Sequence, residues 1–196
     1  MNKTDSPTCY IIAGPNGAGK TTFAMRYLPS IVRCRKFINA DEIARGISPL
    51  DGSAGMFRAS KIFLNELEQN IALRQDFAFE TTLSGRMYLP KIREWRRNGW
   101  RVVLLYLYIP SIDFSLNRIR SRVVQGGHDI PRKDVVRRYP RSIRNLFSYA
   151  AECDMTVCFD NTSETFELIF EQCGSGEPDI VNRTKYLKMR EAGKND

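Results

Sequence analysis

Long hydrophobic runs are missing from this chain of 196 residues, whose longest apolar stretch is nine residues, Val102 to Pro110. A helix needs about 20 apolar residues to span a bilayer, so we expect no membrane span and no signal peptide. Histidine occurs once, at His128, and none of the five cysteines belongs to a C-x-x-C pair. The sequence therefore argues against a zinc site and a disulfide framework, and it predicts a cytoplasmic protein with reduced thiols.

Positive charge is unevenly distributed along the chain. It carries 30 lysines and arginines against 22 acidic residues, a net charge of +8. From Arg86 to Asn145 there are 15 basic and four acidic residues, so this segment carries +11 and the rest of the chain −3. Such a segment suits a polyanion such as ATP, a nucleotide sugar or nucleic acid. It lacks the interleaved aromatic residues of a stacking platform, which argues against nucleic acid.

The segment from Ile11 to Ala24 contains a P-loop, since its residues match G-x-x-x-x-G-K-[ST]. Glycines let backbone N–H groups converge on phosphate oxygens, and the helix that begins there adds a partial positive charge. We expect Lys20 to contact the β- and γ-phosphates of ATP and the Thr21 hydroxyl to bind Mg²⁺. The predicted nucleotide-binding residues here are Gly14, Pro15, Asn16, Gly17, Ala18, Gly19, Lys20, Thr21 and Thr22.

Short apolar runs alternate with helical periodicity along the whole chain. We expect strands at Thr8–Ala13, Lys36–Asn39, Asp76–Glu80, Arg101–Ile109 and Met155–Phe159. We expect helices at Thr21–Leu28, Ser53–Leu73, Met87–Asn98, Ile112–Val124, Arg132–Ala151 and Arg183–Ala192. The pattern predicts an α/β fold, a three-layer P-loop NTPase with a mostly parallel, doubly wound sheet. We expect a single kinase domain over residues 1–196, with 1–7 and about 183–196 peripheral.

The P-loop alone does not distinguish transporter ATPases, GTPases and kinases. A transporter ATPase carries an L-S-G-G-Q signature, but here Leu83-Ser84-Gly85 continues as Arg86-Met87. A GTPase carries N-K-x-D, which is absent from this sequence. A kinase needs a base near the acceptor hydroxyl and arginines for the transferred charge, and the sequence offers both. It therefore favours an ATP-dependent kinase acting on a small-molecule hydroxyl.

Asp41 is the candidate base. It follows the predicted strand Lys36–Asn39, and ligands of doubly wound sheets bind beyond the carboxyl ends of their strands. Its carboxylate could accept the proton of the acceptor or take an outer role on Mg²⁺. The structural alternative is that Asp41 caps a helix starting at Glu42.

Arginines on both sides of a Gly-Gly loop, Gln125 to Pro131, predict a lid. A lid that closes over the nucleotide excludes water and brings charge to the γ-phosphate. We expect Arg122 and Arg138 to be catalytic. Arg137 and Arg138 point in different directions on a helix, so only one of them is expected to enter the site.

Polar residues at other strand ends complete the predicted site. Glu80, Thr81 and Thr82 end the third strand and are the candidate acceptor-binding residues, together with His128 in the lid. Asn161 follows the last predicted strand and is a further nucleotide-binding candidate.

Together these features resemble the zeta toxin family of P-loop kinases, over roughly residues 8 to 165. The resemblance rests on Gly14 to Thr22, Asn39-Ala40-Asp41, Phe79-Glu80-Thr81-Thr82, Gly126 to Pro131, Arg137-Arg138-Tyr139 and Asp160-Asn161. It implies ATP, Mg²⁺ and Asp41 as the base, with UDP-N-acetylglucosamine as the acceptor in the best-known members. It also implies a small antitoxin protein as partner. A nucleotide, cofactor or polynucleotide-end kinase and a non-catalytic ATP-binding protein remain open alternatives.

Overall fold

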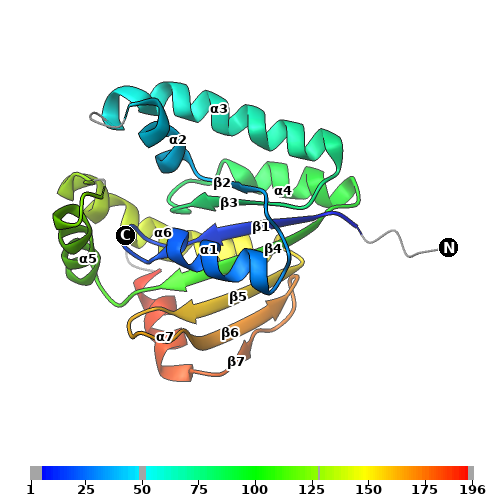
Figure 1. Cartoon of the computed structure of the whole chain (residues 1–196). Coiled ribbons are helices and arrows are strands. Elements are labelled where there is room, and N and C mark those ends of the chain that lie inside the picture. Colours follow the sequence, from blue (N-terminus) through cyan, green and yellow to red (C-terminus); the bar gives the residue numbers. More distant parts are fainter. Residues whose placement is uncertain (1–5, 49–51, 128, 194–196) are drawn as a thin grey trace.

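The computed structural model describes residues 6–48, 52–127 and 129–193, which form a mixed sheet of order β2-β3-β1-β4-β5-β6-β7 (Figure 1). The strands are β1 (Thr8–Ala13), β2 (Phe37–Ile38), β3 (Phe77–Thr81), β4 (Arg101–Tyr108), β5 (Met155–Asp160), β6 (Glu167–Cys173) and β7 (Asp179–Ile180). Strands β1 to β5 pair in parallel. The expected α/β class with a mostly parallel sheet is confirmed.

Helices cover both faces of this sheet. They are α1 (Lys20–Ser30), α2 (Ala40–Ile47), α3 (Gly52–Leu73), α4 (Tyr88–Arg97), α5 (Ile112–Val124), α6 (Arg132–Ala150) and α7 (Arg183–Ala192). Phe23 of α1 packs on Phe159 of β5, with ring centroids 5.7 Å apart. On the opposite face, Phe147 of α6 and Tyr186 of α7 pack on Phe170 of β6. The result is the expected three-layer arrangement.

Aromatic side chains fill the core behind β3. Phe77 and Phe79 are fully buried, and both lie edge-on to Trp95 of α4 at 6.3 Å between ring centroids. Phe63 of α3 meets Phe79 at 6.0 Å. Burying one such side chain stabilises the fold by about 1.5–3 kcal/mol, so this cluster holds β3 firmly against its helices.

Strand register places the loop after β1 between two neighbouring strand ends. Ile12 of β1 lies opposite Glu80 of β3 and Leu105 of β4. The chain runs from β1 to one side of the sheet for β2 and β3 and then to the other side for β4. Ligands of open α/β sheets bind at such a reversal, outside the carboxyl ends. Figure 1 shows α5 lying beyond these ends.

Two helix ends differ from the sequence-based expectation. Helix α1 continues through Pro29 to Ser30 rather than stopping at Leu28. A proline removes one backbone hydrogen bond, and in the last turn that loss does not end the helix at once. Helix α2 begins at Ala40, and its N-cap is Asn39, whose Oδ1 accepts from the backbone N–H groups of Asp41 and Glu42. The prediction that Asp41 could be the cap is therefore wrong.

The hairpin of β6 and β7 was not expected from the sequence. Strand β6 pairs antiparallel with β5 and β7 antiparallel with β6. The β7 strand is two exposed residues, Asp179 and Ile180, so it carries no alternating pattern that a sequence could display.

None of the helices in the described part of the chain is both long enough and apolar enough to cross a membrane.

Candidate active site

The loop between β1 and α1 has the glycine-dependent backbone of a phosphate cradle. Gly14, Gly17 and Gly19 have φ values of +145°, +75° and +80°, where side chains are rarely tolerated. A Cβ on Gly14 would lie 2.3 Å from the carbonyl oxygen of Leu107, and one on Gly19 would lie 2.6 Å from Nδ2 of Asn161. The cradle therefore needs glycine for both conformation and space, as a loop that wraps a phosphate requires.

Lys20, the first residue of α1, is buried beneath this loop. Its Nζ donates to the carbonyl oxygen of Pro15 at 3.0 Å and lies 3.6 Å from Oε1 of Glu80. Only 6% of its side chain is exposed, so the ammonium group is held in place by the loop and by β3. A fixed ammonium at a helix N-terminus is what a bound triphosphate requires.

Glu80 contacts the P-loop directly, which was not expected from its sequence position. Its Oε2 accepts from the Thr21 hydroxyl at 2.7 Å and from Nδ2 of Asn39 at 2.8 Å. Asn39 thus caps α2 with its oxygen and holds Glu80 with its nitrogen. The pairing of β1 with β3 brings Glu80 to this place, so no local motif signals it.

The Thr21 hydroxyl and the Glu80 carboxylate form an oxygen donor set that suits Mg²⁺. No group of three or more histidine, cysteine, aspartate or glutamate side chains gathers as a metal cage among residues 6–48, 52–127 and 129–193. Magnesium usually keeps several water ligands and takes only one or two carboxylates together with substrate phosphates. The residues present therefore fit a magnesium–nucleotide complex.

Two hollows open from the P-loop. The first, which we call the loop pocket, has a volume of about 500 Å³ and lies between α1 and α5. Its lining includes Gly19, Lys20, Thr22, Arg118, Arg122 and Asn161. Asn161 donates from Nδ2 to the carbonyl oxygen of Ala18 at 2.7 Å, so it supports the loop from the β5 side. The second hollow, the junction pocket, has about 180 Å³ and is bordered by Asn16, Thr21, Asp41, Glu80, Arg122 and Gly127.

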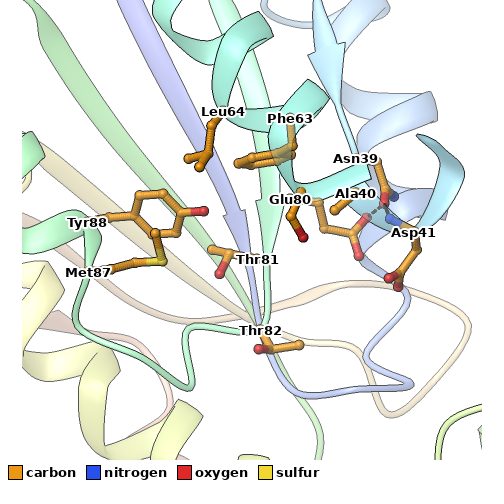
Figure 2. A pocket seen from close by; sticks show the side chains of 11 residues that line it. Asn39, Ala40, Asp41, Phe63, Leu64, Glu80, Thr81, Thr82, Met87 and Tyr88 are labelled. Carbon is orange, nitrogen blue, oxygen red and sulfur yellow. Dashed lines mark hydrogen bonds between the residues drawn. The ribbon is translucent and has the colours of Figure 1, made fainter. Parts of the chain in front are cut away.

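A third hollow, which we call the α3 pocket, lies on the other side of Glu80. Its volume is about 250 Å³, and Figure 2 shows the side chains that line it. The walls are Phe63, Leu64, Met87 and Tyr88, and polar groups at the end of β3 form the floor. Thr81 and Thr82 lie here as predicted, although the Thr81 hydroxyl also accepts from the N–H of Leu83.

Asp41 is exposed and borders both the junction pocket and the α3 pocket. In Figure 2 its carboxylate projects from the start of α2 near that of Glu80. A carboxylate in this place can face a phosphate bound over the loop and a hydroxyl bound in the α3 pocket at the same time.

The predicted lid has a small apolar core of its own. Leu116 and Ile119 of α5 pack with Ile130 and Val135, separately from the main core. The Gly-Gly pair ends α5: Gly127 N–H donates to the Arg122 carbonyl and Gly126 N–H to that of Val123, the Schellman pattern of a helix terminus. Gly126 is thus a helix-terminating residue with φ +80° rather than only a hinge.

The predicted lid arginines are not all brought together. Arg122 lines both the loop pocket and the junction pocket, and Gly127 allows its close approach, since a Cβ there would lie 2.4 Å from the Arg122 Cγ. Arg137 is exposed and pairs with Asp134 at 2.7 Å. Arg138 is half-buried on α6 and is not among the residues that line these three pockets. The prediction for His128 lies outside the described residues.

Arg118 lines the site although it was not among the residues predicted to act there. It lines the loop pocket, lies over the Phe114 ring at 4.6 Å and donates to the Thr162 carbonyl at 3.4 Å. Its position one turn before Arg122 on α5 is the signal that could have identified it.

The C-terminal helix supports the loop pocket through Lys185. Its Nζ pairs with the buried Asp160 at 2.5 Å and with Glu167 at 2.7 Å. Asp160 immediately precedes Asn161, which holds the P-loop. Lys185 of α7, a helix expected to be peripheral, thus pairs with the residue that precedes Asn161.

Replacing Lys185 with methionine should lower the free energy of unfolding by about 1–3 kcal/mol, because a buried carboxylate loses a charged partner. Hydrogen bonds from Lys185 to Asp160 and Glu167 raise the Lys185 pKa, so the contribution is present at neutral pH and is lost only as the pH rises through that raised value. Denaturant unfolding measures the change. Lys188→Met, exposed on the same helix, is the control, and an equal loss there would contradict the assignment.

Comparisons with known proteins agree with this geometry. The family model described as Zeta toxin matches residues 1–166. A protein of Haemophilus influenzae described as uncharacterized is 33% identical over 131 residues, which are 64% of this chain and 88% of that protein.

Solved structures share the fold. The AvrRxo1-ORF1:-ORF2 complex with ATP has a TM-score of 0.75 at 14% identity, over 98% of this chain and 66% of that chain. This chain thus spans slightly less than two thirds of the length of that neighbour. A chain of the PezAT chromosomal toxin-antitoxin system of Streptococcus pneumoniae has a TM-score of 0.63 at 14% identity, over 100% of this chain and 91% of that chain.

Proposed function

The chain belongs to the zeta toxin family, and from that premise we propose that it is an ATP-dependent kinase that transfers the γ-phosphoryl group to a hydroxyl of a small acceptor. The observation that carries the proposal is the place of Asp41. It lies where the phosphate side of the site, the junction pocket, meets the α3 pocket. A kinase needs a base near the acceptor hydroxyl, and a carboxylate at the border of the two pockets supports this role for Asp41.

Each neighbouring group has a role in such a transfer. Backbone N–H groups of the P-loop and the Lys20 ammonium hold the phosphates, while Asp41 accepts the proton of the attacking hydroxyl. Arg122 adds positive charge where negative charge spreads over the transferring group. Thr21 and Glu80 would hold Mg²⁺, which when bound neutralises phosphate charge. Arg138 stays a candidate that reaches the phosphate only if the lid moves.

UDP-N-acetylglucosamine is the first acceptor to test, because it is the acceptor that the resemblance to the best-known family members implies. A small antitoxin protein is the proposed partner. The support for this is family membership and the likeness in fold to a chain of the PezAT chromosomal toxin-antitoxin system. An antitoxin that filled the loop pocket would block ATP.

Nucleic acid is not the proposed partner, although the central segment is strongly basic. Part of that charge is already paired: Arg93 lies 2.5 Å from Glu152, and Arg96 lies 2.9 Å from Asp154. These pairs lie on the α4 side and reduce the field that a nucleic acid would meet.

The test is phosphate transfer from γ-labelled ATP. Purified protein is incubated with UDP-N-acetylglucosamine and, separately, with a small-metabolite extract, and the products are separated by chromatography. We expect label in one small molecule together with ADP, and no transfer when a non-hydrolysable ATP analogue occupies the site. Tight ATP binding without transfer to any acceptor would instead make the chain a non-catalytic nucleotide-binding protein.

A further inference from the structure

The α3 pocket differs in charge from the rest of the site. Of the 11 described residues that line it, none is lysine or arginine, and two are the carboxylates Asp41 and Glu80. The remaining polar groups are uncharged: Asn39 and the hydroxyls of Ser60, Thr81, Thr82 and Tyr88.

The phosphate side of the site, by contrast, carries basic side chains. The loop pocket is lined by the basic residues Lys20, Arg26, Arg118 and Arg122 as well as by Glu42, Glu80 and Glu164. Glu80 lies between the two regions, since it borders both hollows. The fold therefore separates a half with four basic side chains, which suits a triphosphate, from an anionic half without lysine or arginine, which does not suit a second phosphate.

Apolar walls set the shape of what the anionic half can hold. Phe63 is 5% exposed and Tyr88 9%, and Leu64 is half-buried beside them. Burial raises the pKa of Tyr88 to about 12, with a smaller contribution from Tyr149, so its hydroxyl stays neutral at physiological pH. In Figure 2 the Tyr88 hydroxyl points across the pocket toward the side chains of β3 and α3.

We propose that the part of the acceptor bound in the α3 pocket is a neutral or cationic alcohol with an apolar face, and that acceptors carrying a phosphate in this position are rejected. The inference rests on the proposed kinase function, because it takes the α3 pocket as the place of the acceptor. A phosphate there would face the carboxylates of Asp41 and Glu80, and although Lys20 pairs with Glu80 from the phosphate side, the pocket lining itself offers no lysine or arginine. Juxtaposed like charges are strongly unfavourable. A hydroxyl or an ammonium group is compatible with both carboxylates.

The charge of the α3 pocket distinguishes among the classes of acceptor that the sequence left open. A nucleotide kinase transfers to a phosphate of its acceptor, and a polynucleotide-end kinase needs an acceptor with a phosphate close to the reacting hydroxyl. The pocket disfavours both kinds of acceptor. A nucleotide sugar fits only if its sugar enters the pocket while its diphosphate lies outside.

The test uses calorimetric binding in the presence of a saturating non-hydrolysable ATP analogue. Two matched pairs serve as probes: N-acetylglucosamine against N-acetylglucosamine 6-phosphate, and uridine against uridine 5′-monophosphate. The compound 2-amino-1-phenylethanol is the cationic, apolar probe. Each is measured with wild-type protein, with Ser60→Lys and with Asn65→Lys. Ser60 is exposed on α3 and lines the pocket, whereas Asn65 is exposed on the same helix and does not.

We expect wild-type protein to bind at least one of the three probes without phosphate. The phosphorylated members should bind at least about tenfold more weakly than the tightest of these. Ser60→Lys should narrow the discrimination, or weaken the cationic probe, by about fivefold, and Asn65→Lys should not.

Three results overturn the inference: equal or tighter binding of a phosphorylated member, no binding of any probe while the ATP analogue binds, or equal effects of the two lysine variants. Failure of the ATP analogue itself to bind would contradict the proposed function instead. The two failures are therefore distinguishable.

Discussion

Asp41→Asn is expected to lower kcat for phosphate transfer by about 10²- to 10⁴-fold, the range of a lost general base. Asparagine keeps the size of the side chain but cannot accept the proton of the acceptor hydroxyl. The cap of α2 survives, because Asn39 accepts from the backbone N–H of residue 41 and not from its side chain. Affinity for a non-hydrolysable ATP analogue should therefore change by less than about threefold, or ~0.7 kcal/mol. Single-turnover transfer measured beside equilibrium binding checks both values.

Asp113→Asn is the matched control for this prediction. Asp113 is an exposed aspartate in the first turn of α5, which is likewise capped by a side chain, that of Ser111. Transfer should stay near wild type in this variant. If Asp41→Asn transfers phosphate at the wild-type rate, Asp41 is not the base, and if it loses ATP binding as well, its role lies with the metal–nucleotide complex.

Lys20→Ala is expected to reduce transfer by about 10²-fold or more, on the scale of losing one preorganised charge in an active site. Lys20 is buried, and its ammonium group is oriented by Pro15 and Glu80 before any ligand arrives. Removing it takes away a phosphate contact and leaves Glu80 without its cationic neighbour. ATP affinity should fall with the rate, in contrast to Asp41→Asn, and titration calorimetry measures that fall.

Lys36→Ala is the control for the loss of a lysine outside the site. Lys36 is exposed and directly precedes β2. Thermal denaturation of both variants separates a catalytic loss from a folding defect. Wild-type turnover by a folded Lys20→Ala protein would be incompatible with the P-loop acting as a phosphate site.

Much of the site could be predicted because its parts are contiguous in the sequence. The P-loop residues Gly14 to Thr22 lie together, and a strand that is followed by a helix fixes how they meet. Asp41 and Thr82 were expected near the site because each follows a parallel strand, and strand ends meet at one edge of a sheet. Both indeed line pockets beside the loop.

Other parts could not be predicted, because they depend on which strand lies beside which. Glu80 was predicted to bind the acceptor and lines the α3 pocket, but only the pairing of β3 with β1 shows that it also contacts Thr21 and Lys20. Asn39 was part of a motif without an assigned role, and its two hydrogen-bonding ends join α2 to Glu80. The Gly-Gly pair was read only as part of a lid loop, but its hydrogen bonds also end α5.

The sequence by itself determined the fold class, the P-loop and the choice of a kinase over a transporter or a GTPase. These rest on local spacing and residue type, which the linear order of amino acids already contains. Only the tertiary structure decided that Glu80 contacts the P-loop as well as lining the α3 pocket, that Arg137 pairs with Asp134, and that no lysine or arginine lines the α3 pocket. Each of these depends on contacts between segments far apart in the chain, and burial and strand order, not spacing, set such contacts.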